Sequence, residues 1–389
     1  MKSCLAVLLA GLSAGGHAFA STLCVGTADD LTAALAAAQQ DKTASHEIRI
    51  RTGHYLAPDG GWHVDVHQTG TIVIAGGYQD ANCQTEMRSP DASLTSLDGN
   101  QAVRPLTIAT SFDPDMAFNG GQITVSGLTF ENGSGGVVAG LKISDSGPIY
   151  NGGILVERNI FRNNVATVYQ QDNSGGALSA ATDGDGTEPA SFAFLIVRDN
   201  LFAGNRAPDG AAALLFSNNS IDVNDNTFTG NQTTGIRSND VPLAVHTAVT
   251  IFTLAQVVYS NNIFWANNPE NVDGSFDLRA DSTVRATLAA DLFNNDIQTL
   301  HGMPRNQNGN KAVDPGFADA VQGDFRLNAN SPLVDAGKDD PDGGFATVAL
   351  QGFATAVDLQ GEERVQGLHV DIGAYESDQS EFIFKNGFD

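Results

Sequence analysis

The chain has 389 residues, of which 20 are basic and 45 acidic, so its formal net charge is −25. Such a charge repels the phosphates of nucleic acids and anionic lipids, which excludes nucleic-acid binding. With 41% hydrophobic residues, 42 glycines and only 17% charged residues, the composition is typical of neither a disordered nor a mainly helical protein.

Residues 1–20 have the pattern of a signal peptide. Lys2 gives a positive start, residues 5–12 form a short apolar run, and small residues precede Ser21. This pattern predicts export with cleavage before Ser21, which leaves 19 basic and 45 acidic residues and a net charge of −26. No later stretch approaches the ~20 apolar residues of a membrane-spanning helix. We therefore expect an extracellular or outer-surface protein without a transmembrane span.

Two cysteines, Cys24 and Cys83, remain after removal of the signal peptide. An even pair in an exported protein predicts a disulfide, although two free buried thiols are the alternative. A bond across this loop would stabilise the fold by roughly 2–4 kcal/mol.

The predicted N-terminal region, residues 21–100, starts with a helix and continues with short strands. Residues 29–38 combine two aspartates in the first turn with alanine and leucine, which favours a helix. Residues 48–51 and 71–74 alternate in the manner of strands. A helix before short strands is suited to closing the end of a solenoid and protecting its first strand edges.

An asparagine–phenylalanine motif then repeats along residues 101–335. Residues 159–164 read Asn-Ile-Phe-Arg-Asn-Asn, and related segments begin at Asn200, Asn226 and Asn262, with weaker copies around Phe130 and Phe293. Glycine-rich pairs leading into apolar residues precede several copies. The phenylalanines are 26 to 41 residues apart, which suits one solenoid coil per repeat with loops of variable length.

These repeats predict an all-β fold, a right-handed parallel β-helix with a short N-terminal capping helix. Asparagine tolerates left-handed backbone angles at coil corners, and its amide can stack on the asparagine of the next coil. Phenylalanine is expected to point inward and form a stack along the axis. A β-sandwich or propeller is the alternative, but neither explains why the two residue types return together. The predicted stack consists of Phe161, Phe202, Phe228 and Phe264.

The Gly152-Gly153-Ile154-Leu155 and Phe161-x-x-Asn164 motifs resemble repeats of polymorphic outer membrane proteins and pectin-lyase-like β-helices. This resemblance covers roughly residues 48–335 and implies the fold, not an activity. Segments such as 331–337, 358–364 and 370–376 resemble the choice-of-anchor Q domain that ends some bacterial surface β-helices. We assign residues 336–377 to this closing segment and residues 378–389 to a tail that is either a sorting signal or a last edge strand.

No catalytic site is identifiable in the sequence. Hydrolases of the resembled fold use Gly-His-Gly and Arg-Ile-Lys, and this chain contains neither. As bases for a lyase, the candidates Lys142, Arg198, Arg206 and Arg237 are better explained as solvated charges at coil edges. In the closing segment, Asp335, Asp358 and Asp371 are expected to accept hydrogen bonds from backbone N–H groups, paired with Arg364.

An acidic loop is a candidate metal site, and residues 339–342 form a similar acidic run. Asp183, Asp185 and Glu188 have a spacing that could hold calcium through oxygen ligands, although a solvated acidic loop is the simpler interpretation. Two functions stay open. The sequence favours a non-enzymatic surface protein that binds a polysaccharide or cell-surface glycan, or mediates adhesion, over a secreted polysaccharide lyase or glycoside hydrolase, because charge and missing motifs both count against catalysis.

Overall fold

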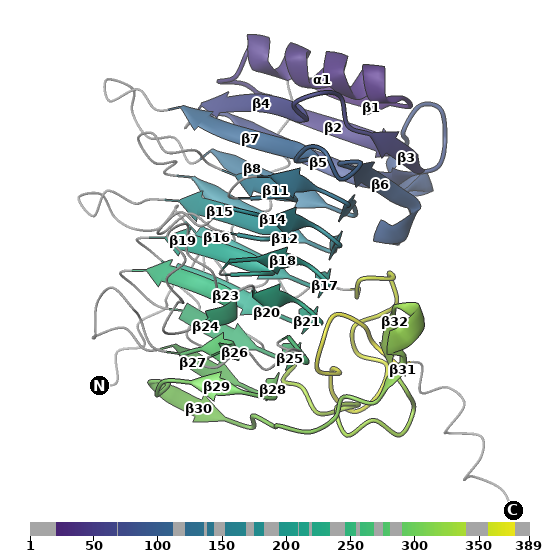
Figure 1. The fold of residues 1–389 in the computed structure, drawn as a ribbon. Coiled ribbons are helices and arrows are strands. Elements are labelled where there is room, and N and C mark those ends of the chain that lie inside the picture. The colour runs from purple at the N-terminus through teal and green to yellow at the C-terminus, as the bar shows by residue number, and fades with distance from the viewer. Residues whose placement is uncertain are drawn as a thin grey trace, which may run out of the picture.

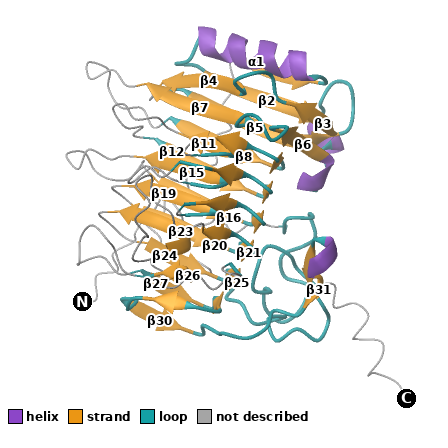
Figure 2. Ribbon diagram, in the orientation of Figure 1, coloured by secondary structure: helices purple, strands orange, loops and turns teal. Residues whose placement is uncertain are grey.

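The computed structural model describes residues 21–67, 69–111, 121–135, 138–143, 152–168, 175–182, 194–208, 210–217, 220–233, 246–253, 257–267, 275–280, 290–339 and 357–377. The predicted signal peptide and the tail over 378–389 lie outside these residues. Figure 1 shows strands stacked in successive coils, with one helix across the N-terminal end and the C-terminal residues beside the opposite end. The fold is a parallel β-helix solenoid, as predicted, and strands dominate it (Figure 2).

Four parallel sheets run along the solenoid within the described residues. Sheet A contains β1 (Ser21–Val25), β2 (Ser45–Arg51), β5 (Thr71–Tyr78), β8 (Gln122–Ser126), β12 (Gly153–Glu157), β16 (Phe194–Arg198), β20 (Ser220–Asn224), β24 (Val257–Ser260), β27 (Asp291–Phe293) and β30 (Asn306–Asn308). Sheet B contains β3 (Gly53–Leu56), β6 (Thr95–Asp98), β9 (Thr129–Glu131), β13 (Ile160–Arg162), β17 (Leu201–Ala203), β21 (Thr227–Thr229), β25 (Ile263–Trp265) and β28 (Asp296–Ile297).

The other two sheets complete each coil. Sheet C contains β4 (Trp62–His67), β7 (Leu106–Ser111), β11 (Leu141–Ile143), β15 (Leu178–Thr182), β19 (Ala213–Ser217), β23 (His246–Thr253), β26 (Ser275–Arg279) and β29 (Leu300–His301). Sheet D, the shortest, contains β10 (Ser134–Gly135), β14 (Val165–Ala166), β18 (Arg206–Ala207) and β22 (Gln232–Thr233).

A phenylalanine stack fills the interior beneath sheet B. Phe161, Phe202, Phe228 and Phe264 occupy equivalent positions of β13, β17, β21 and β25 and are fully buried. Successive ring centroids lie 4.7 Å apart with nearly parallel planes. Phe130 of β9 extends the stack at 5.1 Å. This spacing matches the distance between neighbouring strands, so each ring packs on the ring of the next coil.

Two asparagine ladders fix the corners on either side of sheet B. At the corner between sheets A and B, Asn200 Nδ2 donates to Asn226 Oδ1 at 3.0 Å and to Val156 O of the preceding coil at 2.9 Å. The same pattern recurs in both ladders, and the hydrogen bonds between neighbouring ladder side chains are 2.8–3.1 Å long. The first ladder contains Asn159, Asn200, Asn226, Asn262, Asn295 and Asn310. The second ladder, between sheets B and D, contains Asn164, Asn205, Asn231 and Asn267 and ends on Asp277.

The left-handed residue at each corner is the one before the ladder asparagine. Asp199 and Asp225, for example, have φ of 53° and 56°, and Asn200 and Asn226 follow them in the ladder. The corner residue therefore turns the chain and points outward, while the next residue provides the buried amide. The sequence interpretation assigned both tasks to asparagine, and the structure divides them between two positions.

The N-terminal end is closed by α1 (Ala28–Gln40), as predicted. Thr27 caps the helix by accepting a hydrogen bond from Asp30 N at 3.1 Å. Leu31 and Leu35 are buried against the first coil. The predicted disulfide between Cys24 and Cys83 is also present and ties β1 to the loop after β5, with the two Cα atoms 5.6 Å apart.

The C-terminal residues fold back along the outer face of sheet B. They include a two-stranded antiparallel sheet of β31 (Phe317–Asp319) and β32 (Asp324–Leu327), with the short 3-10 helix η3 (Ala320–Gln322) between them. Residues 357–377 then pack on the coils: Leu359 and Ala374 contact apolar side chains of β13 and β17, and Ile372 contacts Ile263. Two further 3-10 helices, η1 (Thr85–Met87) and η2 (Ala92–Leu94), lie between β5 and β6.

Candidate functional site

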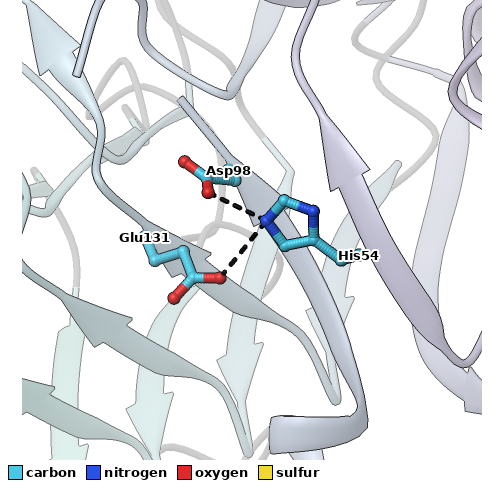
Figure 3. Close-up of side chains that lie close together, drawn as sticks. All are labelled: His54, Asp98 and Glu131. Atoms are coloured by element: carbon cyan, nitrogen blue, oxygen red, sulfur yellow. Dashed lines mark hydrogen bonds and ion pairs between the residues drawn. The ribbon is translucent and has the colours of Figure 1, made fainter. Parts of the chain in front are cut away.

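A polar cluster lies on the outward face of sheet B near the N-terminal end (Figure 3). Its three members come from successive coils: His54 from β3, Asp98 from β6 and Glu131 from β9. Strand alternation turns these side chains outward, because their neighbours Leu97 and Phe130 are fully buried in the core. Asp98 and Glu131 are register partners, so their carboxylates come from adjacent positions of one column.

Short contacts link this cluster to an arginine. His54 Nε2 lies 2.8 Å from Asp98 Oδ2 and 3.9 Å from Glu131 Oε1. Arg162, the next residue of the same column, contacts Glu131 Oε2 through Nε at 2.8 Å and Nη2 at 2.6 Å. The side chains of His54 and Arg162 are 57% and 47% exposed, whereas those of Asp98 and Glu131 are only 13% and 11% exposed. His54 and Arg162 thus face solvent, and the two carboxylates lie beneath them.

The carboxylate of Asp98 is held in its charged form. Burial acts to raise its pKa, but hydrogen bonds from the backbone N–H of Asn100 and the side chains of His54 and Asn132 lower the pKa below its ordinary value. Glu131 is likewise paired with a guanidinium. A general acid needs a proton to give near neutral pH, so Asp98 does not have the properties of one.

The same three side chains could hold a cation. One donor atom from each of His54, Asp98 and Glu131 lies within 4.8 Å of the others. Over the part of the chain that the structure describes, no other group of three histidine, cysteine or carboxylate side chains has such a geometry. An imidazole nitrogen with two carboxylate oxygens is a donor set suited to zinc and related metals.

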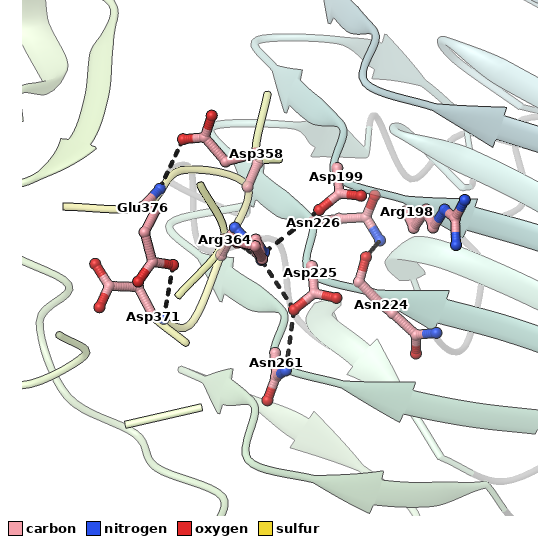
Figure 4. A network of polar contacts seen from close by, with 12 residues as sticks. Arg198, Asp199, Asn224, Asp225, Asn226, Asn261, Asp358, Arg364, Asp371 and Glu376 are labelled. Atoms are coloured by element: carbon pink, nitrogen blue, oxygen red, sulfur yellow. Dashed lines mark hydrogen bonds and ion pairs between the residues drawn. The ribbon is translucent and has the colours of Figure 1, made fainter. Parts of the chain in front are cut away.

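A second polar network lies where the C-terminal residues meet the corner between sheets A and B (Figure 4). Arg364 Nη2 lies 2.9 Å from Asp225 Oδ1, and its Nε lies 3.6 Å from Asp199 Oδ1. All three side chains are at most 10% exposed. Burial acts to lower the pKa of Arg364, but the two carboxylates outweigh it and raise the pKa, so the guanidinium stays charged.

The predicted role of the C-terminal aspartates is confirmed. Asp358 Oδ1 accepts hydrogen bonds from three successive backbone N–H groups over residues 360–362, and Asp371 accepts one from Asp335 N at 2.7 Å. Asp335 Oδ1 in turn accepts from Leu368 N. The predicted pairing of these aspartates with Arg364 is wrong, because its ion pairs are formed with the solenoid corner. The left-handed corner residues Asp199 and Asp225 point outward there, and the one guanidinium forms an ion pair with each of them.

Glu376 carries the largest carboxyl perturbation of this network. Burial and the neighbouring carboxylate of Asp371 raise the pKa of Glu376 to about 8. Its Oε2 accepts from Asp371 N at 3.0 Å, while Oε1 is buried without a hydrogen-bond partner. Glu376 is therefore mostly neutral at pH 7, and its charging would place a second anion beside Asp371.

The predicted candidates for chemistry that the structure describes, Lys142, Arg198 and Arg206, lie on three different sheets and do not come together in one site. The acidic loop with Asp183, Asp185 and Glu188 lies outside the described residues, as does Arg237, so calcium binding there stays a prediction. Arg198 is not a solvated charge: it is buried and pairs with Glu157 at 2.7 Å. Burial acts to raise the pKa of Glu157, but Arg158 and Arg198 outweigh it and lower the pKa. Such a pair stabilises two neighbouring strands.

Sequence reasoning missed the cluster of His54, Asp98 and Glu131. The copy around Phe130 was found as a weak repeat, and aligning it with residues 159–164 places Glu131 beside Arg162. That alignment of the two repeats was the signal in the sequence from which the ion pair of Glu131 with Arg162 could have been predicted. No motif marks His54 or Asp98, because their coils precede the recognisable repeats.

Comparison with known proteins gives no relative for this chain: no family model matches it, and neither does any curated protein. No helix in the described ranges has the length and apolar character needed to cross a membrane. Functional inference therefore depends on the geometry of the sites.

Proposed function

We propose that this protein is exported and acts outside the cell or on its surface as a non-enzymatic β-helix that binds neutral glycans. Export is supported by the signal-peptide pattern of residues 1–20 and by the disulfide between Cys24 and Cys83, which suits an oxidising compartment. The resemblance of the repeats to polymorphic outer membrane proteins and pectin-lyase-like β-helices, and of residues 336–377 to the choice-of-anchor Q domain, supports the same location.

The polar column of sheet B is the observation that carries the binding proposal. Asp98, Glu131 and Arg162 follow one another in register on adjacent coils, with His54 beside them. Adjacent strands are about 4.7–4.9 Å apart, close to the length of one sugar unit in an extended glycan. Ionised carboxylates accept hydrogen bonds from sugar hydroxyls, and arginine and histidine donate to them. A ladder of donors and acceptors is thus available to successive sugars.

Charge selects neutral glycans over uronates. The mature chain carries a net charge of −26, and such a surface repels an anionic polysaccharide. The ionised state of Asp98 and the pairing of Glu131 with Arg162 favour binding over catalysis, because a general acid needs a proton to donate.

A glycoside hydrolase is the second candidate. It is favoured by the carboxylates of Asp98 and Glu131, which come from adjacent coils and approach each other within 4.8 Å. Retaining hydrolases keep their two carboxyl groups about 5–5.5 Å apart. The hydrogen bond between Asp98 and His54 and the ion pair between Glu131 and Arg162 count against this function.

The experiment measures binding and degradation of the same panel of neutral and uronate polysaccharides by the mature protein. Glu131→Gln should weaken binding of a neutral glycan about tenfold, because one charged hydrogen bond and its arginine partner are lost. Glu47→Gln is the matched control, since Glu47 also pairs with an arginine, Arg49, at 2.8 Å and is 12% exposed, but on sheet A. Absence of binding to every glycan would overturn the proposal, and new reducing ends lost in Glu131→Gln would favour the hydrolase.

A further inference from the structure

Each carboxylate of the sheet B cluster has one oxygen held by the protein and one oxygen turned toward His54. Asp98 Oδ1 accepts from Asn100 N at 2.7 Å, and its Oδ2 faces His54 Nε2. Glu131 Oε2 accepts from Arg162, and its Oε1 faces the same nitrogen from 3.9 Å (Figure 3). These outer partners fix the rotation of both carboxyl groups.

Oε1 of Glu131 is the carboxylate oxygen that Arg162 leaves available. The Glu131 side chain is 11% exposed, and its Oε1 lies 3.9 Å from His54 Nε2, which is beyond hydrogen-bond distance. This oxygen therefore borders the space between the three donor atoms, where a cation would meet it.

We propose that His54, Asp98 and Glu131 form a binding site for a divalent transition metal, with zinc as the metal that fits best. One imidazole nitrogen and two carboxylate oxygens supply three ligands, and the 57% exposed His54 leaves the fourth position to water. The three donor atoms now lie within 4.8 Å of one another. On binding they move closer together, so that each forms a metal–ligand bond of about 2.0–2.2 Å in a tetrahedral arrangement. The metal replaces the hydrogen that Nε2 shares with Asp98.

The donor set distinguishes this metal from calcium and magnesium. Calcium takes 6–8 oxygen ligands, and magnesium prefers oxygen ligands in an octahedron, whereas this site offers a nitrogen and two oxygens. Arg162 serves as a positioning residue, because it orients Glu131 without touching the metal. The site exists independently of glycan binding, since no sugar is needed to complete it.

Titration of the metal-free mature protein with Zn²⁺ alone tests the proposal by calorimetry, and Co²⁺ gives an absorption spectrum that reports tetrahedral geometry. One equivalent should bind. His54→Asn and Asp98→Asn should each weaken binding at least tenfold, and Arg162→Met should weaken it about 10–100-fold through Glu131. His54 and Arg162 are half exposed, so His54→Asn and Arg162→Met leave the core intact.

His369→Asn is the matched control. His369 has the same 57% exposure and lies 3.0 Å from one carboxylate, Asp339, but among the described residues no third donor completes a metal-binding group with them. Its substitution should leave zinc affinity unchanged. Absence of saturable zinc binding, or binding that survives both His54→Asn and Asp98→Asn, would overturn the proposal. Equal loss in His369→Asn would do the same, because it would show non-specific binding by surface histidines. A glycan-free titration keeps this outcome separate from that of the glycan experiment.

Discussion

The docking of the C-terminal residues on the solenoid depends on the buried guanidinium of Arg364. Replacing Arg364 by Met keeps the length of the side chain and removes its charge, which leaves Asp199 and Asp225 at the corner without their cation. Breaking a buried ion pair by removing one partner costs about 3–5 kcal/mol, mainly because the other charge stays buried and uncompensated. This loss of free energy should weaken the docking of residues 357–377 and not the solenoid, because the coils keep their asparagine ladders and their core.

Amide hydrogen exchange measures this docking directly. Gly373 N donates to Asn261 O at 2.8 Å, and Ala374 N donates to Thr227 Oγ1 at 3.0 Å, so both amides are protected only while the segment is docked. A loss of 3–5 kcal/mol should accelerate their exchange by about two to three and a half powers of ten. Ladder amides such as Asn226 N should keep their protection.

Arg326→Met is the control, because Arg326 pairs with Asp324 in the same C-terminal region but is 53% exposed. An exposed pair contributes about 0–1 kcal/mol, so exchange at Ala374 should change less than tenfold. A double-mutant cycle of Arg364→Met with Asp225→Asn should give a coupling energy of about 1.5–3 kcal/mol. Exchange in Arg364→Met that matches the Arg326→Met control would refute the role assigned to the buried pair.

Three further changes test other parts of the structure. Phe202→Ala removes a buried ring from the middle of the stack and should cost about 3–5 kcal/mol in urea unfolding, whereas the 90% exposed Val321→Ala should stay within about 0.5 kcal/mol. Glu376 has a pKa of about 8 in the folded protein, above its unfolded value. The stability that its protonation contributes is therefore complete below about pH 4.5 and is lost as pH rises through 8. Protection of the Ala374 amide from exchange should fall over that range, and Glu376→Gln should abolish this pH dependence. Cys24 and Cys83 should accept a thiol label only after reduction, and labelling of the native protein at both would contradict the disulfide.

The repeating elements were predictable because each coil repeats the same physical requirement. Phe202 and Asn200 return in neighbouring coils since every coil needs an inward ring and a buried corner amide. The N-terminal helix and the disulfide were predictable from local composition and from cysteine number. These features are encoded within a few residues or by periodicity, which a single sequence displays directly.

The contacts of the outward faces were not predictable in the same way. Arg364 meets Asp225 because the C-terminal segment folds back across the coils, and nothing local in either segment signals the other. His54 and Asp98 meet because β3 and β6 are adjacent strands, and the imidazole reaches Asp98 two positions beyond its own register partner Ser96, although these coils lack the repeat motif. Which face of the solenoid a residue occupies depends on the lengths of the loops between coils, and these lengths vary along the chain.

The outward column of sheet B is polar near the N-terminal end and becomes apolar further along the solenoid. The two parts have different surroundings. Near the N-terminal end the column consists of Asp98, Glu131 and Arg162, which are paired with one another and open to solvent on one side. Further along it continues with Ala203 and Trp265, which pack in the apolar clusters formed with the C-terminal residues. Inward positions are constrained to rings and aliphatic side chains, so variation along the outward column reflects what each part contacts. The apolar part is covered by the protein's own chain, and the polar part is the surface on which we propose that an external ligand binds.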